Sequence, residues 1–122
     1  MNSQNLLEVQ QVDHFTILRF FDVVDAETVE KIRPIANESI PSVARYFIAD
    51  MSKVEFLDSH GVGFFVSLLK TAHRNKGRLL FAGVHDQPLS VLKMVGFNGP
   101  HVAFYKTMEE AVALNTDNCV MI

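Results

Sequence analysis

The 122-residue sequence holds only one cysteine and no tryptophan. The lone Cys119 cannot form an internal disulfide, and it excludes a zinc site made from paired cysteines. No apolar run approaches the length of about 20 residues that a membrane-spanning helix needs. The first ten residues also lack the basic and apolar segments of a signal peptide. We therefore expect a cytoplasmic protein with no membrane partner.

Positive charge is also scarce, since 11 Lys and Arg residues against 14 Asp and Glu residues give a formal net charge of −3. This balance offers no broad cationic field for phosphate backbones, so we expect no nucleic-acid partner. The hydrophobic fraction of 48% and the charged fraction of 20% are typical of globular proteins and exclude a disordered chain. We expect residues 1–122 to form a single domain, a monomer or weak dimer, with the order of residues 115–122 left open.

Short apolar runs alternate with helical periodicity along the chain. Strand patterns cover residues 6–12, 14–21, 46–49, 78–82 and 102–105. Helical patterns begin near residues 25, 59, 86 and 107. Pro34 predicts that the first helix bends or ends there, and Gly77 is expected in the left-handed position after the second helix. This order predicts an α/β fold, with a mixed, mostly parallel sheet of about five strands and about four helices packed against it.

The junction at residues 58–63, Asp-Ser-His-Gly-Val-Gly, joins a strand to a helix. The first amides of a helix have no partner within the helix, and that end is partially positive. The Ser59 hydroxyl would therefore suit a phosphate group, and Gly61 and Gly63 would let a bulky group approach the backbone. The alternative is that Asp58 and Ser59 only cap the helix. A protonated His60 could partly neutralise a phosphate, or it could simply be solvated.

Catalytic, nucleotide and metal sites find no support in the sequence. The consecutive residues Asp58, Ser59 and His60 cannot converge as a catalytic triad, because successive side chains of a helix point about 100° apart. No G-x-S-x-G elbow, complete dinucleotide fingerprint or G-K-[ST] motif is present. The five histidines lack the spacing of metal ligands. We therefore predict a protein that is not an enzyme and holds no metal or cofactor.

A helical wheel of the segment after residue 59 draws attention to Phe64. The ring falls nearly opposite the apolar stripe that starts at Val62 and Phe65, and Leu68 flanks the same side. A large aromatic ring on the solvent side, one turn from Ser59, predicts a docking anchor for a partner protein. The alternative is that a loop or a neighbouring helix covers it.

With these residues in view, the sequence resembles the STAS family of bacterial anti-sigma factor antagonists. The resemblance rests on the D-S-x-G-x-G pattern at residues 58–63 and extends over residues 47–52, 76–80 and 83–97. It implies that a GHKL-type anti-sigma factor serine kinase phosphorylates Ser59. The unmodified chain would bind that kinase and free a sigma factor, phosphorylation would release it, and a PP2C-type phosphatase would restore binding.

Two positions depart from the family pattern. The family has a turn of roughly G-x-L-D after its second strand, close to the phosphorylated serine, and residues 22–25 read Asp-Val-Val-Asp here. Asp25 therefore carries over, whereas Asp22 replaces the glycine. His60 stands where the family usually has Ser or Thr. The resemblance places Asp22 and His60 on the partner surface, and their divergence leaves open a divergent regulator or a non-sigma output.

A second function also follows from the resemblance. The chain is similar to the STAS subunit of lipid-transport ABC complexes, which acts as a structural adaptor that holds an ATPase. The feature that favours an adaptor is the apolar side formed by Phe64 and Leu68, because a permanent interface could bury it. The partner would then be an ABC ATPase instead of a serine kinase.

Overall fold

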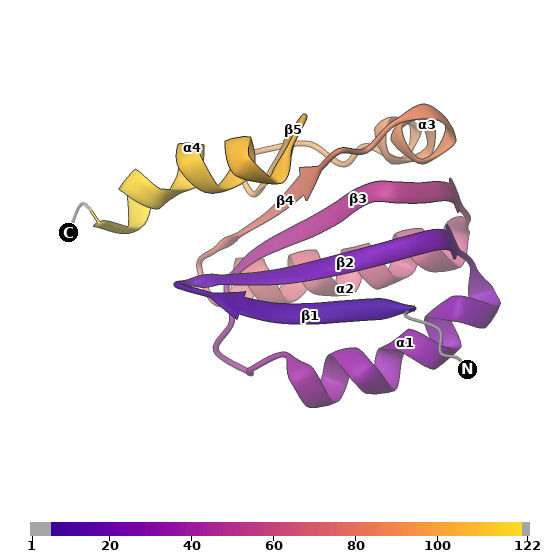
Figure 1. Cartoon of the computed structure of the whole chain (residues 1–122), viewed down its shortest axis with the longest axis horizontal. Helices are drawn as coiled ribbons and strands as arrows, with labels where there is room; N and C mark the ends of the chain where they lie inside the picture. The colour runs from indigo at the N-terminus through magenta and orange to yellow at the C-terminus, as the bar shows by residue number, and fades with distance from the viewer. Residues whose placement is uncertain (1–5, 121–122) are drawn as a thin grey trace.

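The computed structural model describes residues 6–120 of the chain, with side chains described as far as residue 116. Within this part it contains five strands and four helices, as predicted (Figure 1). In chain order they are β1 (Leu7–Val12), β2 (Phe15–Val24), α1 (Ala26–Ser39), β3 (Tyr46–Leu57), α2 (Ser59–Arg74), β4 (Arg78–Ala82), α3 (Asp86–Met94), β5 (Val102–Tyr105) and α4 (Met108–Val120).

The strands form one mixed sheet in the spatial order β1-β2-β3-β4-β5. Only the pairing of β1 with β2 is antiparallel, through the turn at Asp13, whereas β2, β3, β4 and β5 run parallel. The antiparallel hairpin needs only a short turn, but each parallel pairing needs a crossover, which α1, α2 and α3 provide. The predicted α/β class with a mostly parallel sheet is confirmed.

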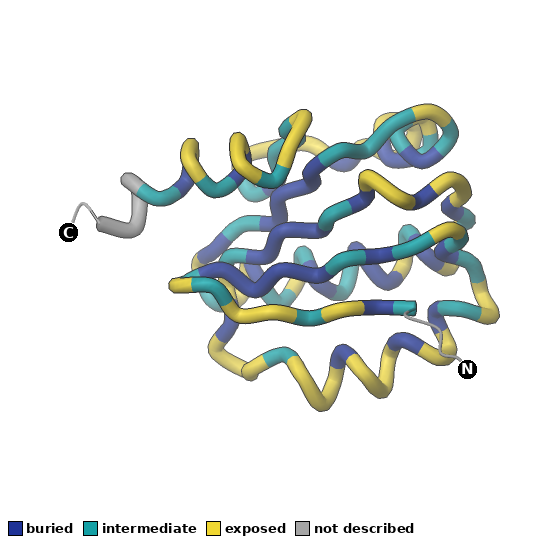
Figure 2. Tube along the Cα trace, in the orientation of Figure 1, coloured by how far each residue is buried: buried dark blue, intermediate teal, exposed yellow. Residues whose placement is uncertain are grey.

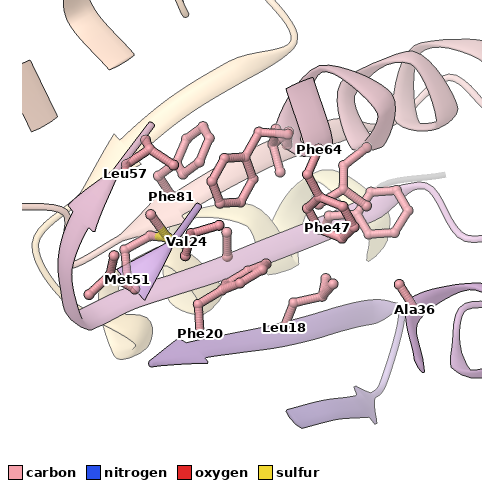
Figure 3. Packing of buried hydrophobic residues seen from close by; sticks show 14 of the residues in the cluster. Leu18, Phe20, Val24, Ala36, Phe47, Met51, Leu57, Phe64 and Phe81 are labelled. Atoms are coloured by element: carbon pink, nitrogen blue, oxygen red, sulfur yellow. The ribbon is translucent and has the colours of Figure 1, made fainter. Parts of the chain in front are cut away.

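Helices cover both faces of the sheet, so its central strands are buried on both sides. Leu79 and Phe81 of β4 point into the larger core, to which α1, α2 and α3 contribute. Figure 3 shows Phe81 within this core. Leu80 and Ala82 of the same strand point to the other face, where Ala111 of α4 covers them. Because both faces are covered, residues 46–49 and 79–82 form apolar runs without polar breaks. Figure 2 shows the buried stretches of β2, β3 and β4 in the middle of the sheet.

Pro34 does not end the first helix, although one of the two predicted outcomes was that it would. α1 continues from Ala26 to Ser39 with Pro34 in its interior. Pro34 lies on the exposed side of the helix, so the missing N–H leaves a carbonyl that water can reach. Ile32 and Ala36, on either side, are buried and anchor both halves of the helix in the larger core. Tertiary packing thus overrides the local preference of proline.

The end of α2 corrects the prediction for Gly77. Lys76, not Gly77, adopts the left-handed conformation, with φ of 64°. The Gly77 N–H donates to the Ala72 carbonyl at 2.6 Å and the Lys76 N–H donates to the His73 carbonyl at 3.1 Å, which is a Schellman motif. Glycine is required at position 77 for a different reason, because a Cβ there would collide with the backbone carbonyl of Arg45.

The segment whose order the sequence left open is largely helical. Residues 115–120 form the last part of α4, and residues 121–122 lie outside the described part of the chain. Asn115 is fully buried: its side-chain oxygen accepts a hydrogen bond from Arg78 Nη1 at 2.9 Å. Its amide nitrogen donates to the Tyr105 hydroxyl at 3.1 Å. These bonds tie the helix to β4 and β5.

Candidate functional site

The residues that the sequence singled out meet at the carboxyl ends of β2 and β3, where α1 and α2 begin side by side (Figure 1). Val24 pairs with Leu57 at the ends of these strands. The Asp58 N–H donates to the Val24 carbonyl at 3.2 Å, which fixes the start of α2 beside the start of α1. Residues that are distant in the sequence, Asp25 and Asp58 among them, therefore occupy one edge of the sheet.

Asp58 caps two helices at once. Its Oδ1 accepts hydrogen bonds from the N–H groups of His60 at 2.8 Å and Gly61 at 3.1 Å, which makes it the N-cap of α2. Its Oδ2 accepts a longer hydrogen bond, 3.3 Å, from the Ala26 N–H at the start of α1. Burial raises the pKa of the Asp58 carboxyl, but these three backbone hydrogen bonds and the nearby His60 outweigh burial and hold the pKa below its ordinary value.

This capping gives Asp58 a pH-dependent contribution to stability. A carboxyl whose pKa is lower in the folded state stabilises the fold above its ordinary pKa of 3.8, and that contribution is lost as the pH falls through the folded-state value. We expect Asp58→Ala to reduce the free energy of unfolding at pH 7 by about 1 to 2 kcal/mol. Urea unfolding at pH 7 and pH 3 should show that the difference in unfolding free energy between the variant and the parent is smaller at the lower pH. A difference in unfolding free energy that grows on acidification would contradict this role. So would an equal loss of stability in Glu38→Ala, which removes a carboxylate at an exposed site.

Asp25 is equally engaged in capping, in this case of α1. Its Oδ1 accepts from the Thr28 N–H at 3.0 Å, and the Asp25 N–H donates back to the Thr28 hydroxyl at 2.8 Å, forming a reciprocal capping box. The two carboxylates of Asp25 and Asp58 thus hold the two helix starts in place. Each also contributes a negative charge to the edge at which Ser59 lies.

Ser59 is the first residue of α2 and is exposed to solvent. Its hydroxyl forms no hydrogen bond with the described residues, so the structure assigns it no capping role. Asp58 alone caps the helix and already binds the His60 and Gly61 amides that the sequence suggested for a phosphate. A phosphate on Ser59 would therefore meet the Asp58 carboxylate and find few free amides. The surface is accessible to a modifying enzyme, but it is not a ready cradle for an anion.

The neighbours of Ser59 divide into exposed and buried groups. The His60 side chain is 64% exposed, and its Nδ1 lies 3.6 Å from Asp58 Oδ2, an ion pair only when the imidazole is protonated. Gly63 is exposed, and a Cβ there would meet no atom within 4 Å. Gly61 is buried, and a Cβ there would lie 2.6 Å from the Val24 carbonyl oxygen. Gly61 therefore permits α2 to pack on the sheet, and Gly63 alone faces the solvent.

Ser59 and His60 line an open groove of about 740 Å³ between α1 and the start of α2. The side of the groove formed by α1 carries residues for which the sequence suggested no functional role. The signal available for them was their helical spacing, which places them on one side of α1. The lining residues are Ala26, Val29, Glu30, Arg33, Pro34, Asn37, Ser59, His60 and Gly63.

Phe64 and Leu68 do not belong to the surface of this site: the exposed docking anchor is wrong, and the alternative, that a neighbouring helix covers Phe64, is confirmed. Phe64 is 2% exposed and Leu68 is 5% exposed. The Phe64 ring packs edge-on against Phe20 of β2, with ring centres 5.9 Å apart (Figure 3). Arg33 of α1 lies over the same ring. The wheel failed because α2 is covered on two sides, so the buried stripe comprises Gly61, Phe64, Phe65, Leu68 and Ala72.

The profile of the STAS domain family matches residues 7–111 of the chain. The chain belongs to the STAS domain family. The matched region includes the sheet, α1, α2 and α3, and therefore the whole edge at which Ser59, Asp25 and Asp58 lie. None of the helices within residues 6–120 is long and apolar enough to cross a membrane. No group of three His, Cys, Asp or Glu side chains among the described residues is placed to hold a metal ion.

Known proteins similar to this STAS domain include both regulators and transporter domains. The anti-sigma-B factor antagonist of Staphylococcus aureus is 24% identical over 90 residues, which are 74% of this chain and 83% of the relative. The anti-sigma factor antagonist SpoIIAA of Bacillus, in its phosphorylated form, superposes with a TM-score of 0.70 at 24% identity, covering 88% of this chain and 97% of SpoIIAA. A sulfate transporter family protein from Wolinella succinogenes superposes with a TM-score of 0.72 at 17% identity, covering 89% and 90% of the two chains. At these identities the superpositions show the fold.

Asp22 stands near the end of β2, at the position where the family pattern has glycine. Asp22 lies at a bulge in the pairing of β2 with β3 and adopts φ of 58°, in the left-handed region that favours glycine. Aspartate is one of the few other residues that adopt this conformation readily. Asp22 is exposed and three residues before Asp25, so its charge adds to the acidic character of this edge.

Proposed function

We propose that this STAS domain is an anti-sigma factor antagonist that binds an anti-sigma factor serine kinase while Ser59 is unmodified and releases the kinase once Ser59 is phosphorylated. The observation that carries this proposal is the free Ser59 hydroxyl, exposed on the first turn of α2 and at the rim of the groove between α1 and α2. Relatives named as anti-sigma factor antagonists, one of them solved in a phosphorylated form, support the same assignment. The protein acts by binding and not as an enzyme.

Release follows from charge at a rigid surface. A phosphate adds about −1.5 to −2 charges at neutral pH, beside the carboxylate of Asp58 and across the groove from Glu30. Because Ser59 is exposed and contributes no cap, the added group needs no rearrangement of α2. Any partner that covers this rim with an acidic or closely packed surface then meets a desolvated negative charge, which weakens binding. His60 offsets part of this charge when it is protonated.

The proposal names further partners. The kinase is of the GHKL type, a PP2C-type phosphatase restores the unmodified state, and both act on this protein in the cytoplasm. The domain works as a monomer or a weak dimer. The lipid-transport adaptor loses the feature that favoured it, because Phe64 and Leu68 are buried under α1 and cannot form a permanent interface.

Phosphorylation of the purified protein tests this assignment directly. We expect incubation with a GHKL-type anti-sigma kinase from the same organism and ATP to add one phosphate, seen by intact mass, and peptide mapping to place it on Ser59. Ser59→Ala should acquire none, and a PP2C-type phosphatase should remove the group from the parent. Phosphate on another residue, with Ser59 unmodified, would overturn the assignment.

A further inference from the structure

A second hollow, of about 250 Å³, lies farther along the interface of α1 and α2, away from Ser59. The later turns of the two helices and the loop before β3 enclose it, and it shares Arg33 and Asn37 with the larger groove. Its floor is apolar and is formed by the buried side chains of Phe47, Phe64 and Leu68. Phe64 therefore lines this partly open hollow as a buried floor residue, and it is not an exposed anchor.

The rim of this hollow is positively charged and contains no acidic residue. Arg33 of α1 and Arg74 of α2 line it from opposite helices. Neither guanidinium forms an ion pair with a carboxylate among the described residues. The chain as a whole carries a net charge of −3, whereas both charged residues that line this hollow are arginines. They create a local positive potential above an apolar floor.

The contacts of these arginines leave their N–H groups available. The Arg33 guanidinium lies over the Phe64 ring, with its Cζ 5.6 Å from the ring centre, so the ring holds the guanidinium while its N–H edge stays free. Arg74 Nη2 makes only a long contact of 3.5 Å with the Thr71 hydroxyl. The Asn37 amide, also on the rim, has no hydrogen-bond partner among the described residues. These groups are donors that suit an oxyanion.

The hydroxyl groups of Ser67 and Thr71 on the rim are already committed as donors. Ser67 Oγ donates to the Phe64 carbonyl at 2.6 Å, and Thr71 Oγ1 donates to the Ser67 carbonyl at 3.2 Å. Their protons are therefore directed along α2, and the charge of a ligand would be met by Arg33, Arg74 and Asn37. The arrangement separates an anion-binding rim from an apolar base within one small volume.

We propose that this hollow binds a small amphipathic anion, a phosphate or carboxylate group joined to an apolar part about the size of one aromatic ring. Arg33 and Arg74 would attract the oxyanion from the two helices that line the hollow. The apolar part would contact Ile40 and Pro41, the lining apolar side chains that remain at least partly exposed. Its volume lies just below the range of pockets that hold larger ligands, which limits the occupant to a small molecule. This site is separate from Ser59 and does not depend on its phosphorylation.

A titration monitored by ¹H–¹⁵N correlation spectra tests the site, with phenyl phosphate and benzoate as the probes. We expect saturable shifts of backbone amides in residues 36–37 and 67–74 with at least one probe. Arg33→Gln and Arg74→Gln should each weaken that binding about tenfold, since each removes one charged contact. Arg45→Gln is the matched control, because Arg45 is exposed and stacks on Tyr46 with its Cζ 5.2 Å from the ring centre, but does not line the hollow. It should bind as the parent does.

Two partial probes separate the contributions of charge and apolar surface. Inorganic phosphate and phenol should each bind more weakly than phenyl phosphate, because each lacks one half of the expected ligand. The dispersion of the same spectra reports whether each variant is folded. Absence of saturable shifts with both probes, or equal weakening by Arg45→Gln, would overturn the proposal. The proposal would also be overturned if Arg33→Gln failed to bind the kinase while neither probe bound the parent protein. Arg33 would then belong to a protein interface and not to a small-molecule site.

Discussion

Ser59→Asp is expected to weaken the binding of the anti-sigma kinase by about a hundredfold or more, because it places a fixed negative charge on the rim that the kinase covers. The variant should keep the circular dichroism spectrum and melting temperature of the parent. An acidic residue at the first position of α2 is compatible with the positive end of the helix, and Ser59 makes no hydrogen bond that would be lost. Isothermal titration calorimetry with the kinase measures the first effect, and thermal melts measure the second.

Two further variants make the Ser59 result specific. Ser59→Ala should bind the kinase as tightly as the parent and should stay bound when ATP is added, because it cannot be phosphorylated. Ser90→Asp adds the same charge to an exposed serine of α3 that does not line the groove, and should leave binding unchanged. Kinase binding by Ser59→Asp at parental affinity would contradict charge repulsion. A loss of helical signal in that variant would instead indicate a conformational switch.

Gly61→Ala is expected to lower the free energy of unfolding by about 2 to 3 kcal/mol, although it adds only a methyl group. The new Cβ would lie 2.6 Å from the Val24 carbonyl oxygen and would collide with the Leu57 side chain. The Val24 carbonyl accepts the Asp58 N–H, so the backbone there cannot move without disturbing the start of α2. Urea unfolding gives the loss of stability, and a melting temperature lower by about 10 °C should accompany it.

Gly63→Ala provides the matched control, since it introduces the same methyl group two residues later in the same helix. A Cβ at position 63 meets no atom within 4 Å, and alanine is favoured over glycine within a helix by about 0.5 to 1 kcal/mol. We therefore expect this variant to be slightly more stable than the parent. Equal destabilisation by the two substitutions would show that packing against Val24 and Leu57 is not the reason for glycine at position 61.

Both substitutions bear on how far the motif at residues 58–63 could be interpreted from sequence. The pattern correctly placed Asp58 at a helix start and predicted two glycines with a shared purpose. The structure separates them, because Gly61 turns toward the ends of β2 and β3 whereas Gly63 turns toward the groove. Which way each residue of a helix faces depends on what packs around the helix, and that information is not contained in the spacing of the motif.

The interface of α1 with α2 accounts for the largest gap between expectation and structure. The wheel of α2 assumed one buried side facing the sheet, and so it placed Phe64 and Leu68 in solvent. α1 covers that side, which buries both residues and brings Arg33 over the Phe64 ring. The same packing creates the groove at Ser59 and the hollow between Arg33 and Arg74. The buried residues of α2, which are Gly61, Phe64, Phe65, Leu68 and Ala72, do keep helical spacing. Spacing alone does not show which of two overlapping apolar stripes on α2 another helix covers.

Local chemistry was enough to establish the order of strands and helices, the parallel sheet and the helix start at Asp58, because each depends on hydrophobic period and capping within a few residues. It was likewise enough to direct attention to Ser59. The fold in three dimensions decided the rest: that Asp58 also caps α1, and that Arg33 and Arg74 line one hollow. These depend on the register of β2 against β3 and on the docking of α1 against α2, which arise only when distant segments meet.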